Sequence, residues 1–352
     1  MKDDTLSTDA VLNSTAPSVS PVEAVAIAKI YFGIEATAEN LSSERDTNYH
    51  LVAPDGRGYA LKFANTAEPA LNTNFQTEAL LHMQREDPTL PVPKVVTSLS
   101  GAPEIALTMS DGRSSVVRVL TWVEGVQLHR VPITRAIRAH VGHTLARIGK
   151  VLANFDHPAS GLDLLWDIKN AARLRAMVPG IPDAPMRQTV MAHLDRFDDL
   201  ISPALAKLRI QVIHNDLNHH NAVVDPAHPE AVSGVLDFGD MVKTALVIDV
   251  AVAASYVTGL DEDALDAVTD LVIAYHKVCP LTRAEIEILR DLIVTRLVTT
   301  IVITDWRATR HPENAPYILR NNGPARRGIE QFASLPCDRV THHLFKSCGL
   351  ES

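Results

Sequence analysis

The chain has 352 residues, of which 46% are hydrophobic and 21% are charged, and its formal net charge is −9. This length allows two packed domains or one domain with two lobes, and the composition is that of an ordinary soluble globular protein. The negative charge, with no concentration of Lys and Arg, argues against a nucleic-acid partner. Three widely spaced cysteines suit a reducing compartment and indicate neither a disulfide framework nor a zinc site.

The N-terminal stretch 1–21 is rich in Ser, Thr, Asp and Pro and is expected to be a disordered tail. It lacks the basic start and apolar run of a signal peptide. No uncharged apolar segment approaches the length that spans a membrane. We therefore expect a cytoplasmic protein without membrane association, whereas the sequence does not indicate an oligomeric state.

The next third of the chain predicts an N-terminal nucleotide-binding lobe over residues 22–124. Residues 22–34 have helical periodicity, and 48–65 form two β-prone runs around a Pro-Asp-Gly turn signal. A helix is expected over 68–85, where the sequence PVPKVV ends it. Strands are expected within 103–109 and 114–123, with a turn at 110–112. The pattern predicts a mostly antiparallel sheet with one inserted helix.

The remainder, residues 125–352, predicts a larger helical C-terminal lobe. Long helices are expected over 133–155, 164–177 and 185–208, and helices resume from Ala245 with breaks near Gly259 and Pro280. A polar, proline-bearing loop is expected over 311–324. The fold class is therefore α+β, a kinase-like arrangement of a small antiparallel-sheet lobe and a helical lobe, with a hinge near 121–125.

The stretch VIHNDLNHHN interrupts a buried strand with polar groups and has the spacing His-x-Asp-x4-Asn. Phosphoryl transfer to a hydroxyl needs a carboxylate that accepts the hydroxyl proton and oxygen ligands for magnesium. Asp216 fits the role of catalytic base and Asn221 that of a metal ligand. Taken alone, a polar loop with Asp216 as a helix N-cap is an equally good interpretation.

A second signal lies in GVLDFGDM, where Asp237, Phe238 and Gly239 follow another apolar strand. Kinases hold their principal magnesium ligand at an Asp-Phe-Gly of this kind. A β-turn would explain the tripeptide alone. The two signals in this order are more specific than either one, and they favour Asp237 as a metal ligand.

The third signal is a lysine inside an apolar strand, Lys62 in YALKFAN. An exposed edge lysine is the ordinary explanation, but a kinase needs such a lysine for the α- and β-phosphates, positioned by a helical glutamate. Glu78 lies in the following helix beside apolar neighbours, where an unpaired carboxylate is costly. We therefore expect an ion pair between Lys62 and Glu78.

With these phrases, and with VRVLTWVEG, LLWDIKNA and ITDWRA, the chain resembles the aminoglycoside phosphotransferase and choline kinase superfamily. More narrowly it resembles the hydroxylysine kinases and the phosphotransferase domains fused to class III aminotransferases. The resemblance implies Mg²⁺ and ATP or GTP as cofactors. It also implies that the segment from Leu120 to Val123, which includes Thr121 and Trp122, faces the nucleotide base.

Two features depart from the superfamily pattern. Most members have Gly after the motif histidine, where this chain has Asn215. The expected phosphate loop SSERDTNYH contains no glycine, so Ser43, Arg45 and Asn48 are the candidate phosphate contacts.

The substrate pocket has weaker sequence support. Helical spacing places Arg296 and Arg307 on one stripe of the helix RLVTTIVITDWRA, where they would grip a carboxylate. Asp240 would face an amine. Further candidates are Trp166, Asp167, Trp306 and Tyr275, although an N-cap for Asp167 and a core position for Tyr275 are the ordinary explanations.

The favoured hypothesis is a kinase that transfers the γ-phosphate of ATP or GTP to a hydroxyl of a small amine or amino acid similar to hydroxylysine. Alternative acceptors are an aminoglycoside, choline or ethanolamine, or a homoserine-type compound. A non-catalytic kinase-like binding module is disfavoured because the five catalytic and cofactor positions are all present. A protein kinase is disfavoured because no activation-segment signature follows Asp237.

Overall fold

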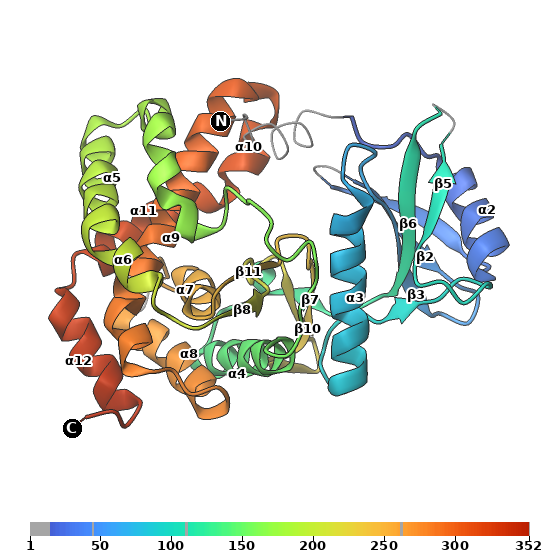
Figure 1. Ribbon diagram of the computed structural model, residues 1–352. Coiled ribbons are helices and arrows are strands. Elements are labelled where there is room, and N and C mark those ends of the chain that lie inside the picture. Colours follow the sequence, from blue (N-terminus) through green and yellow to red (C-terminus); the bar gives the residue numbers. More distant parts are fainter. Residues whose placement is uncertain (1–14, 44–45, 110–111, 261–262, 352) are drawn as a thin grey trace. The chain divides into compact units, whose positions relative to one another are not determined.

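The computed structural model describes residues 15–43, 46–109, 112–260 and 263–351 (Figure 1). The chain divides into two compact units. The first takes in residues 1–125, 155–160 and 233–239, and the second takes in residues 126–154, 161–232 and 240–352. Residues 1–14 of the expected tail, Arg45 of the expected phosphate loop and residues 110–111 of the expected turn lie outside the described part of the chain.

The first unit is built on an antiparallel sheet. Its strands are β1 (Thr37–Leu41), β2 (Thr47–Val52), β3 (Gly58–Phe63), β4 (Val95–Val96), β5 (Ile105–Thr108) and β6 (Ser114–Thr121). Their order is β1-β2-β3-β6-β4, and β5 also pairs with β6. The hairpin and the two later strands confirm the sequence prediction. Strand β1 was not predicted, because it lies at the sheet edge and its sequence TAENL lacks apolar alternation.

Two helices, α2 (Pro21–Phe32) and α3 (Ala70–Glu86), lie on opposite sides of this sheet (Figure 1). Alternate residues of a strand point to opposite faces. One face carries Tyr49, Leu61 and Val119, which pack with Ala28 of α2 in a hydrophobic core. Ser20 begins α2 with a capping box that includes Glu23. The other face, toward α3, is therefore left for polar side chains.

Part of the expected tail is held against the sheet. The Thr47 hydroxyl donates a hydrogen bond to the carbonyl of Pro17, and the Tyr49 hydroxyl donates to the carbonyl of Val19. Residues 15–20 therefore differ from the expectation of disorder, because two strand side chains satisfy their backbone oxygens.

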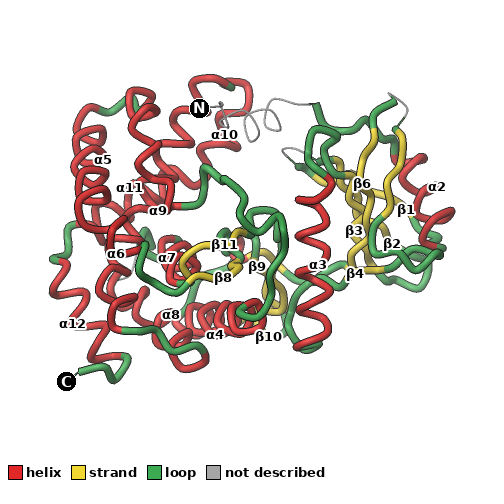
Figure 2. The backbone as a smooth tube through the Cα atoms, viewed as in Figure 1, coloured by secondary structure: helices red, strands yellow, loops and turns green. Residues whose placement is uncertain are grey.

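The second unit is mainly helical, as the tube view in Figure 2 shows. Its helices are α4 (Arg135–Leu152), η2 (Ile168–Gly180), α5 (Ala184–Arg196), η3 (Phe197–Ile201), α6 (Ser202–Leu205), α7 (Val247–Ser255), α8 (Ala264–Val278), α9 (Arg283–Arg310), α10 (Ala315–Ile318), α11 (Asn322–Gly328), η6 (Ile329–Ala333) and α12 (Cys337–Ser347), with short turns η1 (Leu128–Arg130), η4 (Pro312–Asn314) and η5 (Leu319–Asn321). Strand β8 (Ile210–Ile213) pairs with β11 (Val242–Ala245), and a second small sheet has the order β10 (His228–Val235), β9 (Ala222–Asp225), β7 (Val126–Gln127).

Two sequence predictions for this unit were wrong in detail. The helix expected over 164–177 is a 3₁₀ helix, η2, whose buried positions Ile168, Ala171 and Leu174 recur every three residues, as its three-residue turn requires. The loop expected over 311–324 is folded into the short helices η4, α10 and η5 and the start of α11. Its prolines are at first-turn positions, where a missing amide hydrogen is tolerated.

The long helix α9 passes through the core of the second unit. Its residues from Leu289 to Asp305 are all buried. Helices α4 and α8 approach each other closely at Gly142. A Cβ atom at this position would lie 2.1 Å from the backbone oxygen of Leu271. Within the described ranges, no helix is long and apolar enough to cross a membrane.

Candidate functional site

The polar loop between β8 and β9 is anchored by a buried carboxyl group. Asp249 of α7 accepts hydrogen bonds from the backbone amides of Asn215, at 2.8 Å, and His214, at 3.4 Å. His214 and Asn215 are both fully buried. The Nδ1 atom of His214 in turn accepts the amide of Asp216 at 3.2 Å. These hydrogen bonds hold the backbone of the loop at its buried side, whereas the Asp216 side chain is partly exposed.

Asn215 explains how the chain manages without glycine at this position. Its φ is 64°, in the left-handed region that favours glycine. Asn is among the residues that enter this region most readily. Its Nδ2 also donates to the carbonyl of Asp240 at 3.2 Å, which ties the loop to the segment that follows Asp237.

Asp249 itself is strongly perturbed. Burial raises its pKa to about 7, while the amides of Asn215 and His214 act in the opposite direction. Burial disfavours the charged form of a carboxyl group, which is why the pKa rises. This residue was not predicted as functional, although a single acid within the apolar run ALVIDVAVAA was a visible signal.

The Asp216 carboxylate uses both oxygens in the fold. Its Oδ1 accepts from Nη2 of Arg296 at 2.7 Å, and its Oδ2 accepts from the side-chain amides of Asn218 and Asn221, each at 2.9 Å. The side chain is nevertheless 20% exposed. Three donors fix its orientation, while part of the side chain remains exposed.

Asn221 is oriented by the same carboxylate. Its Nδ2 donates to both the backbone oxygen and Oδ2 of Asp216, each at 2.9 Å. An amide group has two donor hydrogens, so the nitrogen side of Asn221 is fully used. Its Oδ1 accepts no hydrogen bond recorded among the described residues. A neutral carbonyl oxygen of this kind fits the hard oxygen ligands that Mg²⁺ prefers.

Arg296 connects Asp216 to the surrounding helices. Its Nη1 donates to the carbonyl of Trp166 at 3.2 Å, and its Nη2 donates to the Tyr256 hydroxyl at 3.1 Å. The guanidinium also lies over the rings of Trp166 and Tyr256, at 5.0 and 5.9 Å from their centroids. Burial alone would lower the pKa of Arg296, but electrostatic interactions with Tyr256 and Asp216 and the hydrogen bond to Tyr256 raise it overall. The group therefore stays positively charged.

This geometry corrects the expectation that Arg296 and Arg307 together grip a substrate carboxylate. The Arg296 side chain is 2% exposed and is engaged by Asp216. Arg307 is partly buried on the same helix. Asp240 lies close enough to Arg296 for its charge to raise the pKa of the guanidinium. Asp240 therefore remains a candidate contact for an amine of the substrate.

The other substrate candidates in this unit are mostly structural. Asp167 is the fully buried N-cap of η2 and accepts from the amide of Lys169 at 3.1 Å. Tyr275 is 1% exposed and belongs to the core. Trp306 packs beside Gly180 and under the guanidinium of Arg310. Trp166 is half-buried and keeps its contact with Arg296.

In the first unit, a polar row crosses the sheet. Asn48, Lys62 and Arg118 are direct partners across β2, β3 and β6. Opposite residues of paired strands point to the same face. Burial lowers the pKa of Arg118, whereas the charges of Asp46, Glu104 and Asp237 act to raise it. Arg118 was missed in the sequence, although it gives the same signal as Lys62, a cation inside an apolar strand.

Helix α3 is tied to this row just before Glu78. Arg118 donates to the side chains of Gln76 and Thr77, the latter at 3.3 Å. The Thr77 hydroxyl donates to Glu104 at 2.6 Å. No contact between Lys62 and Glu78 is recorded among the described side chains, so their ion pair stays a prediction.

Asp237 follows β10 with an exposed side chain and a φ of 58°. Its Oδ1 accepts the amide of Gly239 at 3.1 Å, which forms a tight turn. A non-glycine residue in the left-handed region is uncommon and is found at functional sites. The side chain presents carboxylate oxygen of the type that binds Mg²⁺.

The residues expected near the nucleotide base lie in the first unit. The rings of His50 and Trp122 stack with centroids 3.8 Å apart. A Cβ atom at Gly58 would lie 2.7 Å from Cβ of Trp122, so only glycine fits beneath the indole. Leu120 is buried, and the Thr121 hydroxyl accepts the amide of Lys94 at 2.9 Å. Ser43 is exposed, and its hydroxyl accepts the amide of Asp46 at 3.3 Å.

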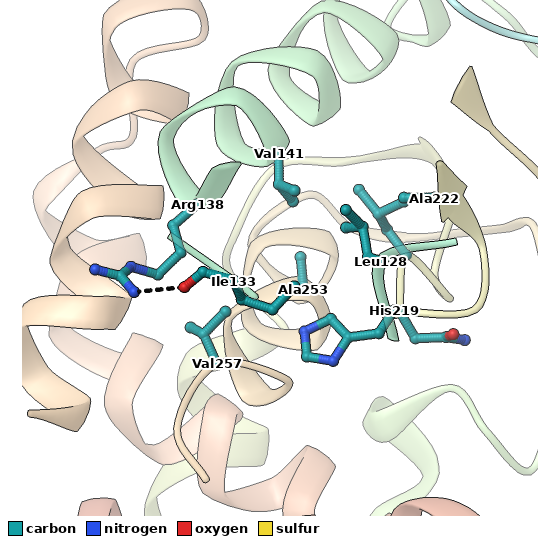
Figure 3. A pocket seen from close by; sticks show the side chains of 10 residues that line it. Leu128, Ile133, Arg138, Val141, His219, Ala222, Ala253 and Val257 are labelled. Carbon is teal, nitrogen blue, oxygen red and sulfur yellow. Dashed lines mark hydrogen bonds between the residues drawn. The ribbon is translucent and has the colours of Figure 1, made fainter. Parts of the chain in front are cut away.

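A small cavity lies behind the loop 214–221 in the second unit (Figure 3). Its volume is about 10 Å³, which is room for roughly one water molecule. The lining is apolar apart from three polar residues, and it comprises Leu128, Ile133, Arg138, Val141, Leu217, Asn218, His219, Ala222, Ala253 and Val257. Arg138 turns away to the carbonyl of Ile133, at 3.0 Å, and to Asp270. This cavity is too small for a hydroxylated amine.

No group of three or more His, Cys, Asp or Glu side chains able to hold a metal occurs in the described part of the chain. Such a cluster is not what magnesium requires in a kinase, because it binds through one or two protein oxygens together with phosphates and water. Asn221 and Asp237 are oxygen donors of that kind.

The comparisons with known proteins agree with this chemistry. A family model, that of the phosphotransferase enzyme family, matches residues 37–281. The hydroxylysine kinase of Danio rerio is 24% identical over 343 residues, which cover 94% of this chain and 96% of that protein. The hydroxylysine kinase of Bos taurus is 26% identical over 326 residues, which cover 87% of each.

Solved structures share the fold at low identity. A microcompartment-associated aminopropanol kinase has a TM-score of 0.65 at 19% identity and covers 92% of this chain and 97% of its own. The amicoumacin kinase hAmiN, solved in complex with AMP-PNP, Ca²⁺ and Ami, has a TM-score of 0.64 at 13% identity and covers 86% of this chain and 91% of its own. The expected α+β kinase-like fold is confirmed.

Proposed function

This chain belongs to the phosphotransferase enzyme family, and from that premise we propose that it phosphorylates a hydroxyl of a small amine or amino acid similar to hydroxylysine. The chain is a small-molecule phosphotransferase of that family. The proposal adds the acceptor class, Mg²⁺ and ATP or GTP as donor, and the roles of individual residues.

The observation that carries the proposal is the arrangement of Asp216. Its carboxylate is oriented by Arg296, Asn218 and Asn221, and part of the side chain remains exposed. In the proposed reaction the acceptor hydroxyl oxygen bonds to the γ-phosphorus while the bond from that phosphorus to the bridging oxygen breaks. The hydroxyl proton passes to Asp216. Proton transfer is late in a loose transition state, so orientation of the carboxylate matters more than its basicity.

The cofactor roles follow from the oxygen and nitrogen groups of each unit. Magnesium, when bound, would neutralise negative charge on the phosphates. We assign Asn221 and Asp237 as its protein ligands. Lys62 would contact the α- and β-phosphates with support from Glu78 and Asn48, and Trp122 would face the base.

The acceptor class rests on similarity and on charge. The hydroxylysine kinases match this chain over most of its length. Asp240 lies near Arg296, which is the partner of the Asp216 carboxylate. Its own carboxylate is suited to bind an ammonium group of the acceptor. Because Arg296 is engaged by Asp216, another cation must recognise any carboxylate of the acceptor.

The direct test is nucleotide turnover with ATP and GTP across hydroxylated amines, hydroxylated amino acids, choline, homoserine and aminoglycosides. We expect acceptor-dependent release of nucleoside diphosphate with hydroxylysine or a similar amino alcohol. Turnover restricted to aminoglycosides or choline would overturn the proposed acceptor class, and no turnover with any acceptor would overturn the assignment to small hydroxylated amines as a whole.

A further inference from the structure

The position of Arg296 is unusual for an arginine on a long apolar helix. Its side chain is among the largest fully buried ones in the described chain, yet it reaches the one carboxylate proposed to receive the acceptor proton. Burying a guanidinium is costly unless it is paired and hydrogen-bonded. Its Nε has no hydrogen-bond partner in this structure. The folded state is therefore less stable with this buried guanidinium than it would be with an apolar residue at the same position.

We propose that Arg296 is a positioning residue that fixes the orientation of the Asp216 carboxylate for the reaction. This inference rests on the proposed function of Asp216. Arg296 holds Oδ1 at 2.7 Å, while the two asparagine amides hold Oδ2. With both oxygens held, the carboxylate is restricted to one orientation toward the acceptor.

The guanidinium is itself prevented from moving. The carbonyl of Trp166 and the hydroxyl of Tyr256 each accept one of its hydrogens, and both rings lie beside it. A planar guanidinium satisfies such divergent acceptors, whereas a lysine ammonium would reach fewer of them. Trp166 and Tyr256 thus act through Arg296, which couples three segments of the second unit to one catalytic carboxylate.

Several polar groups surround this contact. His214 lies within the same loop as Asp216, Tyr256 lies at the end of α7, and Asp240 lies near the guanidinium. Tyr256 is in turn close to His219 and Arg320. Burial raises the pKa of Tyr256, so this hydroxyl is neutral at physiological pH. Arg296 is a cation in direct contact with the carboxylate, so its loss removes the hydrogen bond that holds Oδ1.

The experiment measures kcat and the nucleotide KM for Arg296→Met, Arg296→Lys, Asp216→Asn and the double variant Arg296→Met/Asp216→Asn. We expect Arg296→Met to lower kcat by about 10²-fold, with the nucleotide KM little changed. Arg296→Lys keeps the charge and should recover part of kcat. In the Asp216→Asn background the Arg296→Met change should cost nothing further, because its effect passes through that carboxylate.

The matched control is Arg209→Met. Arg209 also binds a buried carboxylate of α9, that of Glu285 at 2.7 Å, but has no recorded contact with Asp216 among the described residues. This change should lower stability and leave kcat and the nucleotide KM close to those of the wild type. If Arg296→Met does not fold, Arg296→Lys is compared in both backgrounds.

Equal losses in the two backgrounds, or a fall in kcat for Arg209→Met as large as that for Arg296→Met, would overturn the positioning role. Wild-type turnover by Asp216→Asn would instead overturn the proposed function. The two failures are therefore distinguishable.

Discussion

The substitution Asn221→Asp tests the orientation of the side-chain amide that we propose as a metal ligand. It replaces Nδ2, which donates to Oδ2 of Asp216 at 2.9 Å, with a second carboxylate oxygen. A simple expectation is tighter magnesium binding, because the ligand gains charge. The structure predicts the reverse outcome for the enzyme, since two carboxylates would face each other at hydrogen-bond distance.

The magnitude follows from that distance. Two unit charges 2.9 Å apart at an effective dielectric constant of about 20 repel by about 6 kcal/mol. Arg296, at 2.7 Å from the other oxygen, offsets part of this. The two lost hydrogen bonds add about 1 kcal/mol each. The protein can respond by binding a proton between the carboxylates or by rotating residue 221 away.

The assay compares Asn221→Asp with Asn221→Ala for kcat, for the magnesium concentration at half-maximal rate, and for unfolding by denaturant at several pH values. Asn221→Ala should need more magnesium and keep a stability that depends little on pH. Asn221→Asp should be less stable than Asn221→Ala at pH 8 and should regain stability as the pH falls. An Asn221→Asp enzyme that equals the wild type in stability and turnover at pH 8 would refute the assigned orientation.

Three other perturbations follow from the geometry. Asp237→Ala should reduce magnesium-dependent turnover by at least about 10²-fold, and full turnover would remove Asp237 from the metal site. Gly58→Ala should raise the nucleotide KM, because its Cβ would collide with Trp122. An unchanged KM would show that Trp122 does not contact the nucleotide base. For Asp249, burial raises the pKa to about 7, so the folded state retains a proton that the unfolded carboxyl releases near pH 4. Stability should therefore fall as the pH rises from about 4 to about 7. Asp249→Asn should flatten that slope, as followed by thermal unfolding, and an unchanged slope would contradict the buried neutral carboxyl.

Local patterns made part of the site visible in the sequence. Asp216 and Asn221 are five positions apart in one loop, and Asp237 follows the next apolar strand. Such signals can be read from the sequence because one short segment determines the geometry of the residues within it. The hairpin that carries Lys62 was visible for the same reason, since a turn signal separates two β-prone runs.

The contact between Asp216 and Arg296 could not be found in this way. The two residues are 80 positions apart, and helical periodicity identifies a stripe on α9 but not what that stripe faces. The same pattern of polar residues suits a substrate grip and a buried brace. Only tertiary packing distinguishes them, because it determines whether the guanidinium is exposed.

Other residues left signals that were open to interpretation. Arg118 stands within an apolar strand as Lys62 does, and Asp249 stands alone in an apolar helix. Each is a charge that burial makes costly, so each must have a partner. Strand β1 and the 3₁₀ geometry of η2 left weaker signals, because a polar edge strand and a short-period helix depend on their neighbours.

The central claim is that Asp216 receives the acceptor proton in a phosphoryl transfer. The most direct measurement is steady-state kinase activity beside nucleotide affinity for purified Asp216→Asn, which keeps the shape of the side chain and removes its charge. The account predicts unchanged nucleotide affinity and a kcat lower by about 10²-fold or more. A variant that turns over at the wild-type rate would contradict it and would leave Asp216 as a cap of its own loop.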